Sequence, residues 1–323
     1  MGQHFLLSAA AKTLSLSAVA RMSGDQARVT FQHLRWADNG GEPYCPRCGC
    51  LKVYALNSRP AWKCGGCAHQ FSVTSGTVFA DRKRPLRDYL LAIAIFANGA
   101  KGHSALQLSR DLVCQYKTAF VLAHKLRELM AADQATVALD GAGDKEVDGA
   151  YFGGGIKPAN EVANRVDRRA AEEQTGKRQV VVVMRERGGR TLPFVVPRES
   201  AAIPTIRRYI PLGAIVHADE ARGWDALHAH YDMRRINHSV AFSKDGACTN
   251  QAESYFARLR RAEIGTHHRV AGRYLGAYAS EMAWREDNRR VANGAQFASI
   301  ATMAARTPVS RDWHRYWQRS MAA

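Results

Sequence analysis

The sequence predicts a multidomain α/β protein, in which a small cysteine-rich module and a helical segment precede a larger domain of strands and helices. Three observations support this prediction. Two Cys-x-x-Cys pairs lie close together near the start, a segment with helical periodicity follows them, and valine-rich strand-like runs alternate with helices in the second half. The chain has 323 residues, and at about 100–200 residues per domain it accommodates two or three modules.

The chain is strongly basic, with 46 lysine and arginine residues against 29 acidic residues and a formal net charge of +17. A positive surface attracts polyanions, and nucleic acid is the expected partner because each neutralised phosphate releases counterions. Charge alone leaves two other interpretations open, a charge that only maintains solubility and a basic RNA-binding or ribosomal protein. No run of about 18 apolar residues occurs, so we expect no membrane-spanning helix.

Residues 1–36 are expected to be helical. The stretch 5–20 is small and apolar and ends in Ala18-Val19-Ala20, which imitates the cleavage site of a signal peptide. No positively charged segment precedes it and Lys12 interrupts it, so we predict an amphipathic helix instead. Its partly buried leucines are expected to be Leu6, Leu7, Leu14 and Leu16.

Residues 37–80 have the spacing of a zinc ribbon. Cys45-Pro-Arg-Cys48 and Cys64-Gly-Gly-Cys67 are two pairs separated by fifteen residues, and two such turns place four thiolates around one tetrahedral ion. We therefore assign Cys45, Cys48, Cys64 and Cys67 as ligands of a structural Zn²⁺, among short strands at 51–56, 61–63 and 71–73. Cys50 and His69 are nearby ligand types that the site does not require. The clustering of the seven cysteines favours a reducing cytoplasm over a disulfide scaffold.

Residues 81–132 show apolar residues at helix spacing, among them Leu86, Leu90 and Ile93. A short helix near 104–110, a break at 112–114 and a longer helix near 116–130 form the arrangement of a helix-turn-helix. Its candidate DNA contacts are Lys117, Lys125 and Arg127. An ordinary helical hairpin explains the same periodicity. The glycine-containing stretch 133–145 is expected to be a linker.

Residues 146–300 are predicted to form the α/β domain, and 301–323 a helical tail. Strand-like runs occupy 146–154, 179–184, 191–196 and 214–219, with helices at 203–209 and 250–262. Acidic residues stand in the first strand (Asp148), at the end of the last strand (Asp219) and in the first turn of the last helix (Glu253). This order is typical of a ribonuclease-H-like catalytic domain.

Three convergent carboxylates suit the cleavage of phosphodiesters. Two Mg²⁺ ions about 4 Å apart activate the nucleophile and stabilise the leaving oxygen, and Mg²⁺ prefers oxygen ligands. Spacing alone leaves alternatives open, because Asp148 competes with Asp144 and Glu146, and Asp219 competes with Glu220 and Asp225. Glu253 has the best local argument, since the other charged residues of its helix are basic: Arg258, Arg260 and Arg261.

Several motifs resemble those of bacterial insertion-sequence transposases of the IS1595 type, which have an ISXO2-like catalytic domain. The resemblance covers nearly the whole chain. The matching motifs before the α/β domain are Arg35-Trp36, Cys45-Pro-Arg-Cys48, Gln70-Phe-Ser-Val-Thr-Ser-Gly-Thr77, Ala105-Leu-Gln-Leu-Ser-Arg110 and Lys117-Thr-Ala-Phe120. Those within it are Glu146-Val-Asp148-Gly-Ala-Tyr-Phe-Gly-Gly154, His217-Ala-Asp219-Glu220, Thr249-Asn-Gln-Ala-Glu253, Tyr274-Leu-Gly-Ala-Tyr278 and Trp284-Arg285-Glu-Asp-Asn288. Each motif is weak alone, and their combination is specific.

The resemblance implies a ribonuclease-H-like fold, a catalytic Mg²⁺ or Mn²⁺ site, and cleavage and strand transfer at the inverted-repeat ends of a mobile element. It selects Asp148 and Asp219 as metal ligands. The third catalytic position in this family is Glu or Asn followed by a Lys, so Glu253 fits it and Asn250 is a second candidate. Arg260 stands where the family has Lys, and Arg keeps the charge but is not a simple substitute.

The expected partners are double-stranded DNA, both element ends and target, and further copies of this chain, because transposition holds two ends together. Arg258 and Arg261 join the candidate DNA contacts, and the expected location is the bacterial cytoplasm near the nucleoid. The main alternative is a zinc-ribbon DNA-binding protein that no longer cuts, either inactive or domesticated. It predicts salt-sensitive DNA binding without cleavage.

Overall fold

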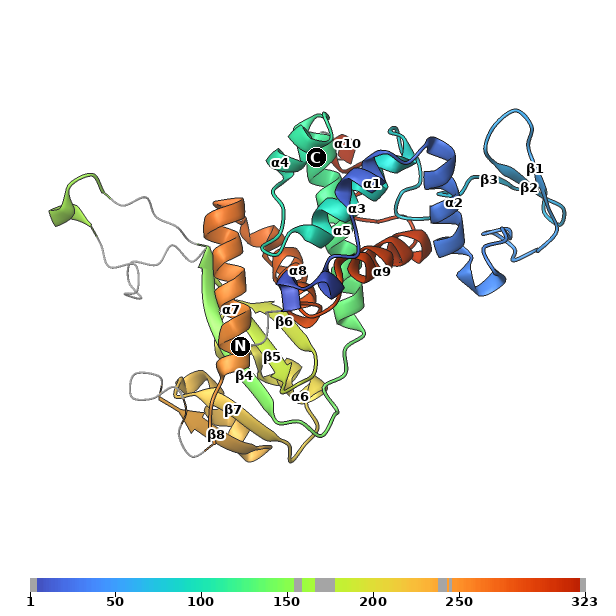
Figure 1. Ribbon diagram of the computed structural model, residues 1–323. Coiled ribbons are helices and arrows are strands. Elements are labelled where there is room, and N and C mark those ends of the chain that lie inside the picture. Colours follow the sequence, from blue (N-terminus) through green and yellow to red (C-terminus); the bar gives the residue numbers. More distant parts are fainter. Residues whose placement is uncertain (1–4, 154–158, 166–177, 238–242, 244–245, 320–323) are drawn as a thin grey trace. The chain divides into compact units, whose positions relative to one another are not determined.

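The computed structural model describes residues 5–153, 159–165, 178–237, 243 and 246–319 (Figure 1). The chain divides into two compact units. Unit 1 comprises Met1–Leu129 and Asn288–Ala323, and unit 2 comprises Met130–Asp287. The expected boundary at residue 300 therefore lies at 287. Helix α9 (Asn293–Arg306) packs on α2 (Gly24–Arg35) and α3 (Leu86–Asn98) of unit 1.

The N-terminal end is less regular than the single amphipathic helix that we expected. It forms two short 3-10 turns, η1 (Phe5–Leu7) and η2 (Ala9–Ala11), before helix α1 (Leu16–Ala20). Leu6 and Leu7 are 45% and 60% exposed and Leu16 is 38% exposed, so the predicted burial is wrong for these three leucines. The regular helix is α2, which begins with a capping box between Ser23 and Gln26.

The cysteine-rich part of unit 1 is a three-stranded antiparallel sheet in the order β1-β2-β3. Its strands are β1 (Val53–Ala55), β2 (Trp62–Cys64) and β3 (Gln70–Phe71). The core of this small sheet is aromatic, since Trp36 packs edge-on against Trp62 and Phe71. Arg35 is buried and donates to the carbonyls of Val73 and Ser75, which ties the end of α2 to the exit of the sheet.

The helices of unit 1 follow the predicted order. After α3 come α4 (Ala105–Asp111) and α5 (Tyr116–Ala135), separated by a short turn. Ser104 accepts a hydrogen bond from the N–H of Gln107 and so caps α4. The predicted tail contributes the end of α9 and the short helix α10 (Tyr316–Arg319).

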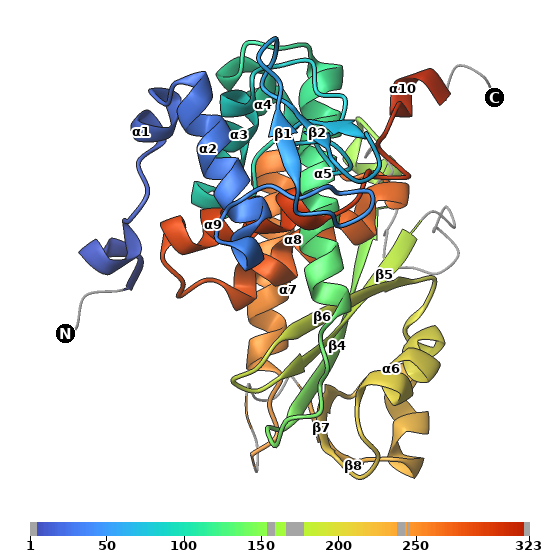
Figure 2. The same cartoon turned by 90° about the vertical axis from the view of Figure 1, so that its right-hand side faces the viewer.

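Unit 2 is built on a five-stranded mixed sheet in the order β6-β5-β4-β7-β8 (Figure 2). Strands β4, β5 and β6 pair antiparallel, whereas β7 and β8 run parallel to β4. The strands are β4 (Lys145–Gly153), β5 (Arg178–Glu186), β6 (Thr191–Val196), β7 (Ile215–Asp219) and β8 (Asp232–Ile236). The sequence did not predict β8, and Gly154, the last residue of the first strand motif, lies outside the described residues.

Helices cover both faces of this sheet, which explains the continuous valine run of β5. Val180 and Val182 pack with Trp224 and the α6 side, whereas Val181 and Val183 pack with α7 and α8. The elements on these faces are α6 (Ile203–Tyr209), α7 (Asn250–Ala262) and α8 (Leu275–Asp287), and the 3-10 turns η6 (Glu199–Ala202) and η7 (Arg222–Ala229). A strand buried on both faces has no polar side, so its periodicity disappears.

The predicted linker 133–145 is not a free connection. Residues up to Ala135 continue α5, and Val137 and Leu139 are buried in the core on the α6 side of the sheet. The remaining short elements of unit 2 are η4 (Val162–Asn164), the π-helical turn η8 (Glu263–His267) and η9 (Gly272–Tyr274). Among the helices of the described chain, none combines the length and hydropathy needed to cross a bilayer.

Candidate metal centres and nucleic-acid contacts

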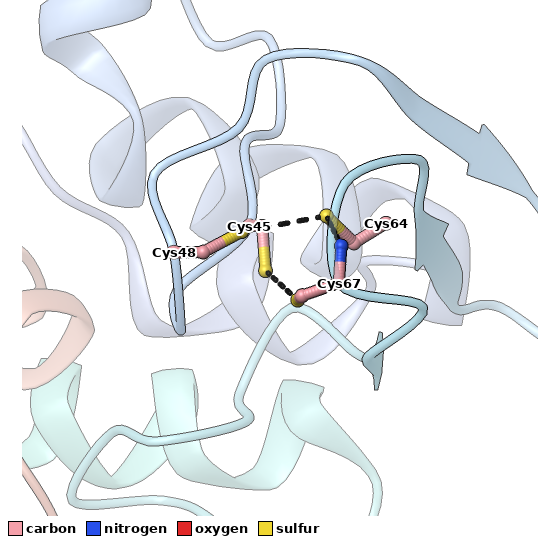
Figure 3. Close-up of side chains that lie close together, drawn as sticks. All are labelled: Cys45, Cys48, Cys64 and Cys67. Atoms are coloured by element: carbon pink, nitrogen blue, oxygen red, sulfur yellow. Dashed lines mark hydrogen bonds between the residues drawn. The ribbon is translucent and has the colours of Figure 1, made fainter.

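Four cysteines of unit 1 converge on one point (Figure 3). Cys45 and Cys48 come from one loop and Cys64 and Cys67 from another, and the four sulfur atoms all lie within 4.8 Å of one another. Sulfur separations of 3.7 Å (Cys45 to Cys67) and 3.6 Å (Cys48 to Cys64) match the edges of a tetrahedron around one ion. Four thiol donors at this spacing fit Zn²⁺, as predicted.

Backbone N–H groups favour the thiolate form of one of these cysteines, Cys64. The backbone N–H groups of Gly66 and Cys67 point at the Cys64 sulfur, at 3.2 and 3.4 Å. The N–H of Cys67 does most to lower the pKa of the Cys64 thiol, which falls to about 6. The nearby ligand types are engaged elsewhere, because Cys50 donates to the Lys52 carbonyl and His69 stacks on Phe71. The site therefore has four protein ligands and no open position, which is typical of structural zinc.

The acidic centre of unit 2 lies where β4 and β7 run side by side. These parallel strands pair with Val147 opposite Ala218, so continuation of the register places Asp148 beside Asp219. Asp148 is flanked in the strand by Val147, which faces the α6 side, and it shares the opposite face with Ala150. That face is covered by α7, which carries Glu253 in its first turn.

The structure separates Asp148 from the acids that competed with it. Asp144 pairs with His217 at 2.9 Å and with Arg187 at 3.3 Å. Glu146 is 1% exposed and pairs with Arg187 at 2.9 Å. The Asp148 carboxylate, in contrast, accepts a hydrogen bond from its neighbour Gly149 N–H and forms no ion pair with another described residue. Of the two acids in β4, Glu146 therefore has a cationic partner among the described residues and Asp148 has none.

Asp219 is also distinguished from its competitors. Its Oδ1 accepts hydrogen bonds from the indole N–H of Trp224 (2.8 Å) and from the N–H of Ala221 (3.2 Å), which fix the orientation of the carboxylate. Glu220 is exposed, and Asp225 is exposed and paired with Arg235. Asp148 within β4 and Asp219 at the end of β7 thus offer carboxylate oxygens, the ligands that hard divalent cations prefer.

Glu146 holds the first turn of the helix that carries Glu253. One oxygen of Glu146 accepts the N–H of Gln251 (2.8 Å) and of Ala252 (2.9 Å), two of the unpaired donors at the start of α7. A carboxylate at this position is also favoured by the helix dipole. Because Glu146 and Asp148 are two residues apart in β4, one strand fixes both an acid of the centre and the helix that supplies Glu253. Asn250 is exposed at the start of α7.

The Asp148 carboxyl group is affected by the charges of three other acids. Burial, the charge of Asp219 and the charges of Glu253 and Glu199 raise the pKa of Asp148 to about 7, against the lowering effect of the Gly149 N–H. Glu199 is itself affected, since burial and then the charge of Asp219 raise its pKa. Among the described residues, however, only the cysteines bring three or more metal-ligating atoms all within 4.8 Å of one another.

The candidate DNA contacts of unit 1 differ in exposure. Lys117 is exposed, with its ammonium 5.2 Å from the centre of the Trp317 ring. Lys125 is half-buried and donates to the Val78 carbonyl, and burial lowers its pKa. Arg127 is fully buried, lies over the Phe96 ring and donates to the His103 carbonyl. Arg127 therefore has a structural role, and we leave it out of the proposed DNA contacts.

The three arginines of α7 also differ. Arg258 pairs at 2.9 Å with Glu286, a buried residue of α8, so it anchors the helix. Arg260 and Arg261 are exposed. Arg260 is seven residues after Glu253 and lies on the same face two turns further along, where its guanidinium is available to a phosphate.

Sequence reasoning missed three features of this region: Glu199, the capping role of Glu146 and the hydrogen bond from Trp224 to Asp219. Glu199 precedes a short helix at no diagnostic spacing from the other acids, so only the tertiary structure identifies it. The sequence did contain a signal for Glu146. Side chains two residues apart in a strand lie on the same face, so Glu146 is expected on the face of Asp148. The sequence indicates only that Trp224 is apolar, and it does not predict the hydrogen bond from its indole to Asp219.

Two domain families match the chain. Residues 140–287 match the ISXO2-like transposase domain, and residues 22–70 match the transposase zinc-ribbon domain. No curated protein and no solved structure matches the chain.

A zinc-ribbon module and an α/β unit with an acidic centre, each matching a transposase domain, define the class of protein as a transposase. The chain belongs to the IS1595 family, after which both matched domains are named.

Proposed function

We propose that this protein is a DNA transposase that binds the inverted-repeat ends of an insertion sequence and catalyses strand cleavage and strand transfer at an acidic, two-metal-ion centre. The observation that carries the proposal is the placement of Asp148 beside Asp219 under the helix that bears Glu253, within the residues that match a transposase domain. The other acids near Asp148 in the sequence are engaged in ion pairs.

The topology of unit 2 supports a ribonuclease-H-like fold. Three antiparallel strands are followed by two strands parallel to the first, in the order β6-β5-β4-β7-β8. The acids stand in the central strand, at the end of its parallel neighbour and on a following helix, as the sequence predicted. Because β4 and β7 are adjacent, Asp148 and Asp219 lie side by side although they are far apart in the sequence.

The donor set fits Mg²⁺ or Mn²⁺. Asp148, Asp219 and Glu253 offer only carboxylate oxygens, which hard divalent cations prefer, and Asp148 and Asp219 have no cationic partner among the described residues. When bound, such ions would activate the attacking hydroxyl and stabilise the leaving oxygen. Other residues of the chain orient these ligands. Trp224 fixes the Asp219 carboxylate, and Glu146 fixes the first turn of α7, which carries Glu253.

The remaining assignments concern DNA. We propose that the zinc ribbon and the helices α4 and α5 recognise the element ends, with Lys117 as an exposed phosphate contact and Lys125 beside it on α5. Near the acidic centre, Arg260 and Arg261 are proposed to hold phosphates, and an arginine can do so with two parallel hydrogen bonds. Synapsis of two ends requires a homo-oligomer on DNA, acting in the bacterial cytoplasm.

The first prediction tests the acidic centre. Asp148→Asn, Asp219→Asn and Glu253→Gln should each reduce Mg²⁺- or Mn²⁺-dependent cleavage of the element ends by at least about 10²-fold, the scale of losing one fixed electrostatic contact in a transition state. Cleavage is measured on labelled duplexes that carry the flanking DNA. Asn250→Ala separates the two candidates for the third position, since it should leave most activity if Glu253 is the ligand.

Binding to the same duplexes provides the control. All three acid variants should bind DNA as well as the wild type, because none of them removes a positive charge. If the variants cleave as fast as the wild type, the site assignment is wrong. If the wild type binds but does not cleave, the protein is instead a DNA-binding relative without cleavage activity, which the substitution of Arg260 for the family's Lys leaves open.

A further inference from the structure

A fourth carboxylate, Glu199, lies against the acidic centre. Glu199 begins η6, the turn that leads from β6 into α6, and is separated in sequence from each of the three proposed ligands. Its charge acts on Asp148 and is acted on by Asp219. The motifs that identify the family do not include it, and sequence spacing did not select it.

Two glycines make room for the Glu199 side chain. A methyl group built on Gly149 would lie 2.9 Å from both Cγ and Oε1 of Glu199, and one built on Gly223 would lie 2.9 Å from Cβ and 3.2 Å from Oε2. Gly149 follows Asp148 directly, and Gly223 is in the 3-10 turn just after Asp219. The Glu199 side chain therefore lies against the backbone of Gly149, next to Asp148, and against that of Gly223 in η7.

Glu199 and Glu253 approach the sheet from opposite sides. Side chains alternate along β4, so Gly149 faces the side of α6 while Asp148 faces the side of α7. Glu199 fills the position above Gly149, and Glu253 stands in the first turn of α7. The pair Asp148 and Asp219 thus has one glutamate on each side.

The Glu199 carboxylate has no compensating partner among the described residues: it forms no hydrogen bond or ion pair with them, although it is half-buried. Partial burial of a charge without a cationic partner is unfavourable, and adjacent like charges add to the penalty. A buried acid usually has a cationic partner. In unit 2, for example, Glu286 forms ion pairs with Arg185 and Arg258. A divalent cation bound among the carboxylates would supply the missing positive charge.

We infer that Glu199 is a fourth ligand of the acidic centre, which binds a divalent cation together with Asp148 and Asp219. The inference rests on the proposed function, because it assumes that this centre binds Mg²⁺ or Mn²⁺. It also explains why residues 149 and 223 are glycines, because a larger side chain at either position would collide with Glu199.

The test is Mn²⁺ binding to the zinc-loaded, full-length protein without DNA, followed by electron paramagnetic resonance and by thermal unfolding. Glu199→Gln should weaken the binding of Mn²⁺ by about tenfold or more, as expected when a group supporting a metal site is lost. Without Mn²⁺, the same variant should unfold at a higher temperature than the wild type, because one repelling charge is removed. Glu220→Gln is the matched control, since Glu220 is exposed and makes the same change in charge.

A second variant moves Glu199 without changing any charge. Gly149→Ala places a methyl group against the carboxylate end of Glu199, and it should weaken Mn²⁺ binding in the same direction as Glu199→Gln. Glu199→Asp, which keeps the charge on a shorter side chain, should bind Mn²⁺ better than Glu199→Gln. A residue with only a structural role would not show this rescue.

The outcomes separate the inference from the proposed function. If Asp148→Asn loses Mn²⁺ binding while Glu199→Gln binds like the wild type and Glu220→Gln, then Glu199 is not a ligand and the proposed centre stands. If Asp148→Asn and Asp219→Asn also bind like the wild type, the metal centre itself is refuted, and the inference is refuted with it.

Discussion

Asp148 is the residue whose environment departs most from that of an ordinary surface acid. It is partly buried, and burial together with the charges of Asp219, Glu253 and Glu199 raises its pKa to about 7. An acid with a raised pKa in the folded state favours folding only while it is protonated. Its unfavourable effect on stability therefore develops as the pH rises from about 4, near its pKa in the unfolded chain, to about 7.

This sign gives a prediction for Asp148→Asn in zinc-loaded protein without added Mg²⁺ or Mn²⁺. At pH 8 the variant should be more stable than the wild type by up to about 4 kcal/mol, which corresponds to the change of pKa from 3.8 to about 7 at 1.36 kcal/mol per unit. At pH 4 the difference should be much smaller. Urea unfolding at both pH values measures it, and a difference that is independent of pH would contradict the assignment.

The element that matters most for the acidic centre is α7, because its position determines where Glu253 lies. Its apolar face packs on the sheet through Tyr255, Phe256 and Leu259. Its start is fixed by Glu146, and Arg258 and Ser254 bind Glu286 of α8. A helix fixed at its first turn holds a first-turn side chain in one place, which a metal ligand requires.

Glu146→Gln should loosen this first turn. The variant loses the charge that two backbone N–H groups and Arg187 share, and we expect a destabilisation of about 1–3 kcal/mol from the hydrogen bonds that are lost or weakened. Hydrogen exchange of the Gln251 and Ala252 amides should become faster, and Mn²⁺-dependent cleavage should fall. Glu220→Gln serves as the control. Unchanged exchange at both amides in a folded variant would show that Glu146 does not hold the helix.

The zinc ribbon is the second element with a prediction of its own. Its three short strands bury little besides Trp36, Trp62 and Phe71, and structural zinc contributes about 10–16 kcal/mol of apparent binding free energy in small modules of this kind. Cys64→Ser should therefore lose the zinc and unfold the strands. Elemental analysis and circular dichroism measure this, and Cys50→Ser should keep the zinc. Retention of zinc by Cys64→Ser would refute the ligand set.

At the scale of the whole molecule, the net charge of +17 dominates. Several acids in the described part of unit 2 are paired inside the protein, as in the pairs Lys145–Glu186 and Arg185–Glu286. Exposed cations such as Lys117, Arg260 and Arg261 remain for a polyanion. The excess charge therefore predicts how DNA binding responds to salt.

DNA affinity should fall by about 10³-fold or more between 50 and 200 mM salt, as expected for about six or more phosphate contacts. Fluorescence anisotropy with a labelled duplex measures the affinity at each concentration. Lys117→Ala should reduce the slope of log affinity against log salt by about 0.9, the contribution of one phosphate. An affinity that hardly changes with salt would contradict a phosphate-based interaction.

The sequence by itself determined the features that depend on local spacing. The cysteine spacing determined the zinc site, because both ligand pairs are local turns. Periodicity located α3 to α7 and the strands β4 to β7 to within a few residues, and the motifs led us to propose Asp148, Asp219 and Glu253 as the acids of the centre. The sequence-based prediction was wrong for the N-terminal helix and for the linker 133–145, because packing outweighs weak local preferences there. It also missed β8, whose residues are neither uniformly buried nor alternately buried and exposed.

Only the tertiary structure decided which polar side chains lie next to one another in space. It removed Asp144 and Glu146 from the candidates because distant residues, His217 and Arg187, pair with them. It placed Arg127 in the core, and it brought Glu199 next to Gly149 and Gly223. The physical reason is the same in each case: the state of a charged side chain depends on its neighbours in space, and parallel strands and crossover helices bring together residues that sequence spacing does not relate.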